Sequence, residues 1–150
     1  MLIWKIKKFD DLTLCQMHDM YKLRSEVFVV EQNCVYLDVD GRDGEALHVL
    51  GYEKDQLVAY TRIFLPSDQR AAVNFGRVVV AYSHRQKNYG RRLIQQTLDV
   101  IAVQMSGEDK YIIDISAQEY LLNFYASFGF SKVGEPYLED DLPHIRMVKK

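Results

Sequence analysis

Residues 78–93 read VVVAYSHRQKNYGRRL, an apolar run followed by a basic loop and the start of a helix. The apolar end is typical of a central strand that is buried on both faces. Backbone amides that open a helix are free donors, and the helix dipole favours an anion beside them. Asn88 and Gly90 are residue types that tolerate left-handed or tight backbone, so this turn can aim several amides at one point. The segment therefore predicts a site for a small polyanion such as a pyrophosphate.

The flanking sequence alternates between strand and helix patterns. Strand patterns cover residues 2–8, 47–53, 57–65, 73–82, 111–117, 131–137 and 144–148, and helical patterns cover residues 13–31, 90–105 and 119–128. Thr13 and Gln16 have the spacing of a capping box at the start of the first helix. Strand–helix–strand units around the two later helices predict a mixed α/β fold. The length of 150 residues predicts one domain over residues 1–150.

Composition and charge exclude several classes of protein. Apolar residues make up 48% of the chain and charged residues 27%, as in an ordinary globular domain. The net charge of −2 argues against a nucleic-acid partner, although residues 69–98 carry six basic and no acidic side chains. The longest apolar run, residues 78–82, is far shorter than the roughly 20 residues of a membrane helix. Cys15 and Cys34 lack the spacing of a redox pair, which favours reduced thiols in a cytoplasmic protein.

Two acidic clusters lie outside the basic segment. One comprises Asp38, Asp40, Asp43 and Glu45, and the other comprises Glu139, Asp140 and Asp141. The first resembles a calcium-binding loop, but Arg42 and Val49 occupy positions where such a loop needs oxygen ligands. No other metal-ligand spacing is present, so no metal site is expected. We expect both clusters to be solvated loops, with attraction of a cationic substrate as the alternative.

Several segments together point to a known family. Residues 85–90, RQKNYG, resemble the Q/R-x-x-G-x-G/A acyl-CoA pyrophosphate motif of GNAT N-acetyltransferases, with Asn88 at the usual first glycine. Segments similar to the ElaA-like branch of this superfamily are residues 23–34, 36–41, 76–78, 117–118, 123–130 and 143–145. The resemblance covers nearly the whole chain. It implies a central sheet of about six to seven mostly antiparallel strands that is splayed in the middle and flanked by helices.

The resemblance also implies acetyl-CoA as co-substrate and assigns residues to it. Val78, Val79 and Val80 would offer main-chain groups to the pantetheine arm. The pyrophosphate would be held by the amides of Gln86, Lys87, Asn88, Tyr89, Gly90 and Arg91, with added charge from Arg85 and Lys87. Gln118 and Asn123 would line the pantetheine side, where two central strands separate. Tyr125 matches the family tyrosine near the thioester sulfur.

Amine acetylation makes specific chemical demands. An alkyl ammonium with a pKa of about 10.4 costs roughly 4–5 kcal/mol to deprotonate at pH 7, so a base is useful. A tyrosine is mostly protonated at that pH, so Tyr125 is assigned as the acid for the leaving thiolate, with aromatic packing as the alternative. A backbone amide of residues 78–80 is expected to stabilise the oxyanion. Glu31 is the first candidate for the base, with pairing to Arg24 or to a loop amide as its alternative.

The sequence says less about which residues bind the amine that accepts the acetyl group. Arg24, His48, Asp114 and His144 are assigned to the acceptor, and the last three are also candidates for the base. For His48 the alternative is a hydrogen-bonded structural role, and Asp114, inside an apolar strand, must be paired or lie where the strands separate. These assignments predict an N-acetyltransferase acting on a small cationic or peptide amine. The contrasting hypothesis is a non-catalytic acyl-CoA sensor or protein-interaction module, and a homodimer formed through the C-terminal hairpin is left open.

Overall fold

The computed structural model describes residues 1–150. The strands are β1 (Leu2–Lys8), β2 (Leu47–Glu53), β3 (Gln56–Phe64), β4 (Asn74–Val80), β5 (Ile113–Gln118), β6 (Ser131–Glu139) and β7 (Leu142–Lys149). The helices are α1 (Leu14–Arg24), α2 (Tyr89–Gln104) and α3 (Leu122–Ala126), and a π-helical segment, Ser25–Glu31, continues α1. The predicted order of strands and helices is confirmed. The third helix is shorter than predicted because residues 119–121 form a 3₁₀ turn.

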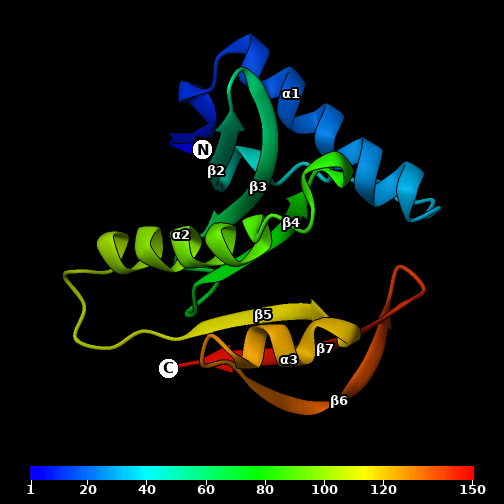
Figure 1. The fold of residues 1–150 in the computed structure, drawn as a ribbon. Coiled ribbons are helices and arrows are strands. Elements are labelled where there is room, and N and C mark those ends of the chain that lie inside the picture. The colour runs from blue at the N-terminus through cyan, green and yellow to red at the C-terminus, as the bar shows by residue number, and fades with distance from the viewer.

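The strands form two antiparallel sheets that touch at one point. The first sheet has the order β1-β2-β3-β4 and the second has the order β5-β7-β6. A single parallel bridge joins Val73 to Ile113, with the Val73 amide donating to the Ile112 carbonyl at 2.8 Å. Beyond this bridge β4 and β5 pair no further, and Figure 1 shows them diverging toward their C-terminal ends. The expected mostly antiparallel sheet that is splayed in the middle is therefore confirmed.

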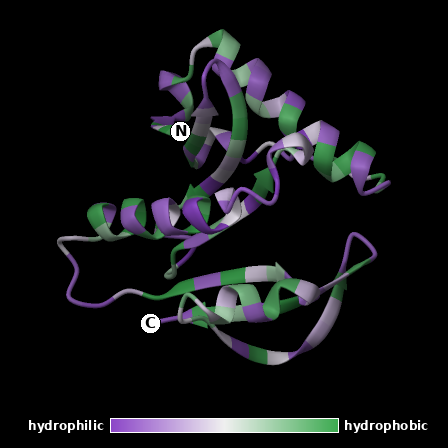
Figure 2. Cartoon of the chain, viewed as in Figure 1, coloured by the Kyte–Doolittle hydropathy of each residue, from purple (hydrophilic) through white to green (hydrophobic).

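Apolar side chains form a core on each face of the first sheet. Val49 of β2 packs with Leu93 and Ile101 of α2, and this core continues onto the second sheet. Leu50, the next residue of β2, packs with Met20 of α1 in the other core. Neighbouring strand residues point to opposite faces, so a strand buried on both faces serves two helices. Figure 2 shows α1 and α2 striped with hydrophobic and hydrophilic residues, as this arrangement requires.

A local sequence signal accounts for where α1 begins. Thr13 and Gln16 form the predicted capping box, with the Gln16 amide 3.1 Å from Thr13 Oγ1 and the Thr13 amide 3.0 Å from Gln16 Oε1. Each bond satisfies an amide that the first helical turn leaves unpaired.

None of the helices combines the length and apolar character that crossing a lipid bilayer demands.

The aspartates of the first acidic cluster are buried or half-buried, so the prediction of a solvated loop is wrong for them, whereas Glu45 is exposed as expected. Asp38 and Asp43 are only 5% and 3% exposed. Arg24 of α1 is fully buried and donates to Asp38 from Nε at 2.9 Å and to Asp43 from Nη1 at 2.7 Å. The arginine–aspartate cluster as a whole comprises Arg24, Arg62, Arg77, Asp38, Asp40 and Asp43. The arginines come from three separate elements, so no local pattern in the loop reveals them.

The charges of this cluster hold Asp40 and Asp43 ionised. Hydrogen bonds from Arg62 lower the pKa of Asp40 below its ordinary value. Burial alone would raise the pKa of Asp43, but the hydrogen bonds and charges of Arg24 and Arg62 lower it overall. The second acidic cluster, residues 139–141, lies exposed at the tip of the β6–β7 hairpin, as expected.

Replacing Arg24 by Met should strongly destabilise the fold. It leaves the buried carboxylates without their partner, and such a loss typically costs about 3–5 kcal/mol in the free energy of unfolding. Lys22→Met is the matched control, because Lys22 lies on the same helix in an exposed pair with Glu26 at 3.7 Å. It should change the free energy by less than about 0.5 kcal/mol. Urea unfolding measures both variants, and equal effects would contradict a structural role for the cluster.

Stability should also fall as the solution becomes acidic. His48 of β2 is fully buried, and its burial lowers its pKa. A group whose pKa is lower in the folded than in the unfolded protein stabilises the fold fully when the pH is above its unfolded-state pKa. That unfolded-state pKa is about 6.5 for His and about 3.9 for Asp, and the stabilisation is lost as the pH falls below it. The free energy of unfolding should decline below about pH 6.5 through His48, and more steeply below about pH 4 through Asp40 and Asp43. His48→Gln should abolish the first decline, whereas the exposed His18→Gln should retain it.

Candidate functional site

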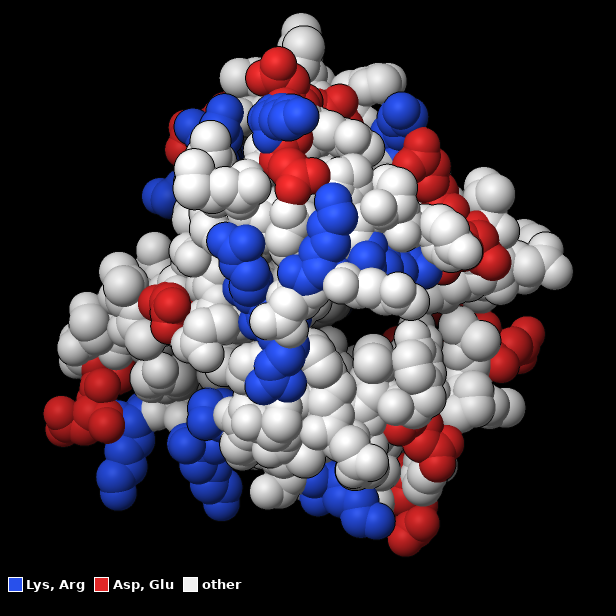
Figure 3. All heavy atoms as spheres, viewed as in Figure 1, with Lys and Arg blue, Asp and Glu red and all other residues white.

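Two adjoining cavities lie where β4 and β5 diverge. The loop-side cavity, about 670 Å³, is lined by β4, the π-helical segment and the loop that precedes α2. The hairpin-side cavity, about 330 Å³, is lined by β3, β4, β5 and the β6–β7 hairpin. Residues that line both are Phe28, Gln32, Val78, Gln118, Leu121 and Tyr125. A molecule in one cavity can therefore meet a molecule in the other. Figure 3 shows the surface hollowed between the two halves of the molecule, with basic side chains beside the opening.

The loop before α2 presents a row of free backbone donors. The N–H groups of residues 86–91 donate no hydrogen bond within the protein. Gln86 and Asn88 have φ angles of 66° and 64°, so the left-handed backbone expected at Asn88 is confirmed. Left-handed residues alternating with right-handed ones turn successive N–H groups toward one point, which forms an anion-binding nest. A Cβ on Gly90 would meet nothing within 4 Å, so open space lies beside these amides. The loop therefore fits a pyrophosphate group.

Strand β4 offers a second set of unpaired main-chain groups. It pairs with β3 on one edge only, and Val78, Val79 and Val80 line the loop-side cavity. The pairing with β3 shifts register between Tyr60 and Arg62. An edge with free N–H and C=O groups can pair with an extended ligand in the manner of an added strand.

Glu31 and Arg85 form an ion pair at the loop-side cavity. Arg85 donates to the two Glu31 carboxylate oxygens at 2.7 and 3.0 Å, and its Nε donates to the Val80 carbonyl at 3.1 Å. Both residues line the loop-side cavity and neither lines the hairpin-side cavity. The partner of Glu31 is therefore Arg85, not the expected Arg24 or a loop amide. With both oxygens occupied, Glu31 is not a free base.

Glu53 of β2 contacts side chains of the loop that precedes α2 and of the first residue of that helix. It accepts a hydrogen bond from the Tyr89 hydroxyl and lies 2.9 Å from His84 Nε2. Lys87 Nζ lies 3.8 Å from the same carboxylate, and Lys87 lines neither cavity. The Lys87 ammonium therefore lies near Glu53 in this structure, and its added charge toward a pyrophosphate stays a prediction. Glu53 could not be identified from the sequence, because its partners lie more than 30 residues away.

Tyr125 lies at the junction of the two cavities. Its ring packs against Phe124, Phe130 and Phe75 at centroid distances of 5.2, 5.9 and 6.3 Å. Burial raises its pKa above the ordinary value, and no hydrogen bond contributes to the shift. The residue therefore keeps its proton at neutral pH. Gln118, at the end of β5, also lines both cavities, whereas the neighbouring Asn123 lines neither.

His144 is the base candidate that lines the hairpin-side cavity. Its Nδ1 lies 2.8 Å from the Leu142 carbonyl, which can only accept, so Nδ1 carries a proton. The Nε2 atom is then free to take a proton, and it lies 3.4 Å from Glu139 Oε2.

The other residues assigned to the acceptor lie outside both cavities. Arg24 is enclosed in the arginine–aspartate cluster. His48 is buried with Nδ1 2.7 Å from the Tyr60 hydroxyl and Nε2 2.9 Å from the Asp43 carbonyl, so neither nitrogen is available. Asp114 pairs with Arg146 at 2.7 Å on the second sheet. These expected roles are corrected to structural ones.

Several residues of the hairpin-side cavity were not assigned to the site from the sequence, although the acidic cluster that contains Glu139 and Asp140 had attraction of a cationic substrate as its alternative role. They are Tyr36, Arg42, Arg62, Asn74, Arg77, Ser116, Glu139 and Asp140. They come from five regions of the chain, and only the sheet topology brings them together. Segments 36–41 and 76–78 pointed to this region through the family resemblance, but without a role for any side chain.

Comparison with known proteins bears on what this site does. Residues 17–150 match the family model described as "Acetyltransferase (GNAT) domain". The chain is 40% identical to Protein ElaA of Escherichia coli over 152 residues, which covers all of this chain and 97% of that protein. A relative from Synechocystis is also 40% identical over 146 residues, covering 97% of this chain and 93% of that protein.

Two solved structures are similar to this chain over its full length. The crystal structure of Escherichia coli ElaA superimposes with a TM-score of 0.90, and each chain is covered in full. A structure described as an acyl-CoA N-acyltransferase from Pseudomonas aeruginosa superimposes with a TM-score of 0.92 at 38% identity, again over both full chains. The family resemblance seen in the sequence is confirmed, and the chain belongs to the GNAT family of acyl-CoA N-acyltransferases.

Proposed function

We propose that this protein transfers an acetyl group from acetyl-CoA to a primary amine by direct attack of the amine on the thioester. The observation that carries the proposal is the position of Tyr125, which lines both the cavity with the free loop amides and the cavity with His144. In this proposal acetyl-CoA occupies the loop-side cavity and the amine occupies the hairpin-side cavity. Bulky Phe28 and Leu121 beside Tyr125 favour a short acyl group.

The chain's own groups account for binding and orientation. The amides of residues 86–91 hold the pyrophosphate, and the helix dipole of α2 adds to the attraction. The free edge of Val78, Val79 and Val80 pairs with the pantetheine arm, and Gln118 contacts it from the β5 side. An amide of that edge also donates to the oxyanion that develops on the carbonyl oxygen.

The proposed proton transfers balance. His144 Nε2 takes one proton from the ammonium, and the neutral nitrogen forms the C–N bond as the C–S bond breaks. The Tyr125 hydroxyl gives its proton to the leaving sulfur and recovers one from the new amide nitrogen. One proton then leaves from His144 to solvent. Burial raises the pKa of Tyr125, so its hydroxyl is protonated when the reaction begins and takes its proton back after each transfer.

Replacing Gly90 by Ala should weaken acetyl-CoA binding without loss of stability. The added methyl meets no protein atom within 4 Å, so any effect comes from the ligand that it faces. Losing charge-assisted bonds to the amides should raise the Kd by roughly 10-fold or more, measured by calorimetry. Gly107→Ala, which also adds a methyl in open space, is the control and should bind normally.

A truncated ligand makes this experiment more specific. An acetyl-pantetheine without the pyrophosphate should bind the native protein and Gly90→Ala equally. If Gly90→Ala binds acetyl-CoA as tightly as the native protein, the loop amides do not hold the pyrophosphate.

Replacing Tyr125 by Phe should slow turnover while leaving acetyl-CoA binding nearly intact. The ring and its aromatic packing are kept, and only the proton donor is lost. General acid catalysis commonly contributes about 10²–10⁴-fold, so kcat for thiol release should fall by about 100-fold with little change in Kd. Tyr120→Phe is the control, because Tyr120 is exposed and lines only the loop-side cavity. An equal loss of binding and turnover would refute the acid role, and binding without any amine-dependent thiol release by the native protein would favour a sensor.

A further inference from the structure

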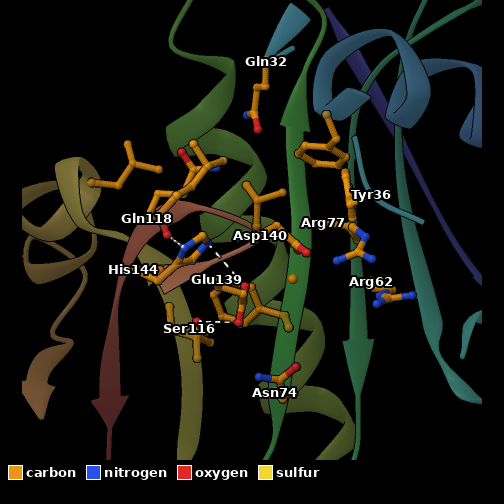
Figure 4. Close-up of a pocket in the computed structure, with 18 of the residues that line it drawn as sticks. Gln32, Tyr36, Arg62, Asn74, Arg77, Ser116, Gln118, Glu139, Asp140 and His144 are labelled. Carbon is orange, nitrogen blue, oxygen red and sulfur yellow. Dashed lines mark hydrogen bonds and ion pairs between the residues drawn. The ribbon is translucent and has the colours of Figure 1, made fainter. Parts of the chain in front are cut away.

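The hairpin-side cavity has walls of opposite charge. The connection between α1 and β2 contributes Arg42, β3 contributes Arg62 and β4 contributes Arg77, whereas the β6–β7 hairpin contributes Glu139 and Asp140. Figure 4 shows Arg62 and Arg77 on one side of the cavity and Glu139, His144 and Ser116 on the other. No ion pair joins an arginine of one wall to a carboxylate of the other. The two sets of charges are therefore held apart by the width of the cavity.

The arginine wall keeps hydrogen-bond donors that the protein does not use. Arg62 is only 4% exposed and binds Asp40 and Asp43 through Nη1 and Nη2, but its buried Nε has no partner. Arg77, with 22% of its side chain exposed, donates from Nη2 to the Asp38 carbonyl at 3.1 Å and to Asp40 Oδ2 at 3.4 Å. Its buried Nε lies 2.9 Å from Asp38 Oδ1 without hydrogen-bond geometry, and its Nη1 has no hydrogen-bond partner within the protein. An unpartnered donor on a buried charged side chain points to a ligand that completes it.

Arg42 completes this wall. Its guanidinium carbon lies 4.4 Å from the centre of the Phe64 ring, and its only ion pair is with Glu45 at 3.5 Å. Arg77 has a left-handed φ of 54° at the register shift of β4, although Gly76 precedes it and would adopt that backbone at less cost. Strained backbone of this kind is found where a side chain is held for a function.

The opposite wall is built to receive a cation. Glu139 Oε1 accepts from Ser116 Oγ at 3.3 Å, and its Oε2 lies 3.4 Å from His144 Nε2. The Asp140 carboxylate has no ion pair within the protein. An ammonium group beside this wall lies next to His144, which the proposed function makes its base.

We infer that the amine acceptor also carries a carboxylate, so that it is a zwitterion of the amino-acid class. This inference rests on the proposed function and specifies its acceptor. The carboxylate binds the free donors of Arg42 and Arg77, and the amine faces Glu139 and His144. A polyamine fits less well, because its second cation would meet the arginine wall. The alternative of a cationic substrate rested on both acidic clusters, and the aspartates of the first are already paired with arginines, so only the second is left to receive the amine.

Matched acceptors test the inference directly. Thiol release from acetyl-CoA is measured with L-amino acids and with the amines that remain when their carboxylate is removed, for example L-lysine against 1,5-diaminopentane. The best amino acid should exceed its decarboxylated partner in kcat/KM by at least about 10-fold, the effect of losing a charge-assisted bond. Arg42→Gln should reduce this ratio about 10-fold, through KM for the amino acid.

Arg70→Gln is the matched control. Arg70 also contacts the Phe64 ring and pairs with Glu45, but it does not line the hairpin-side cavity, so the ratio should stay unchanged. Arg77→Gln should lower the same kcat/KM ratio. Arg77 belongs to the buried cluster, so this variant can fail to fold, and in that case Arg42→Gln alone tests the carboxylate site. An unchanged ratio in Arg42→Gln, or a preference for the decarboxylated amines, would overturn the inference.

A binding measurement separates this inference from the proposed function. Saturation-transfer NMR detects amino-acid binding to the native protein without any need for turnover. Amino acids that bind through Arg42 without thiol release would overturn acetyl transfer and retain the carboxylate site. Thiol release that favours decarboxylated amines would retain acetyl transfer and overturn the carboxylate site.

Discussion

The single bridge between Val73 and Ile113 is the constraint on which the functional site depends. Strands β4 and β5 pair there and nowhere else, so each presents an unpaired edge along the rest of its length. Unpaired main-chain groups inside a protein are costly unless something binds them. The two cavities, the free edge of β4 and the position of Tyr125 all follow from that divergence.

The arginine–aspartate cluster ties the fold to the site. Its aspartates lie on the long connection between α1 and β2, and its arginines lie on α1, β3 and β4. The ion pairs fix that connection as one wall of the hairpin-side cavity. Buried ion pairs contribute little net stability compared with apolar packing, but removing one partner is expensive. The cluster therefore fixes the positions of Arg62 and Arg77 beside the cavity.

Much of the fold and part of the site could be predicted from the sequence. Hydrophobic periodicity and capping residues act locally, so the element order and the left-handed backbone of Asn88 were predictable. The contacts between side chains that lie far apart in the chain could not be predicted. Glu31 pairs with Arg85 across 54 positions, and the partners of His48 and Asp114 are also set by tertiary contacts. Of the four base candidates, only the structure could single out His144 as the one that lines the hairpin-side cavity.

The central claim is that acetyl-CoA binds with its pyrophosphate on the loop before α2 and its pantetheine arm along β4. Backbone amide chemical shifts recorded during titration with acetyl-CoA test it most directly, because each residue reports separately. The account predicts that the largest changes fall on residues 86–91 and on Val78 to Val80, and that the changes at residues 86–91 vanish with acetyl-pantetheine. Saturable binding that leaves both segments unperturbed would contradict the account.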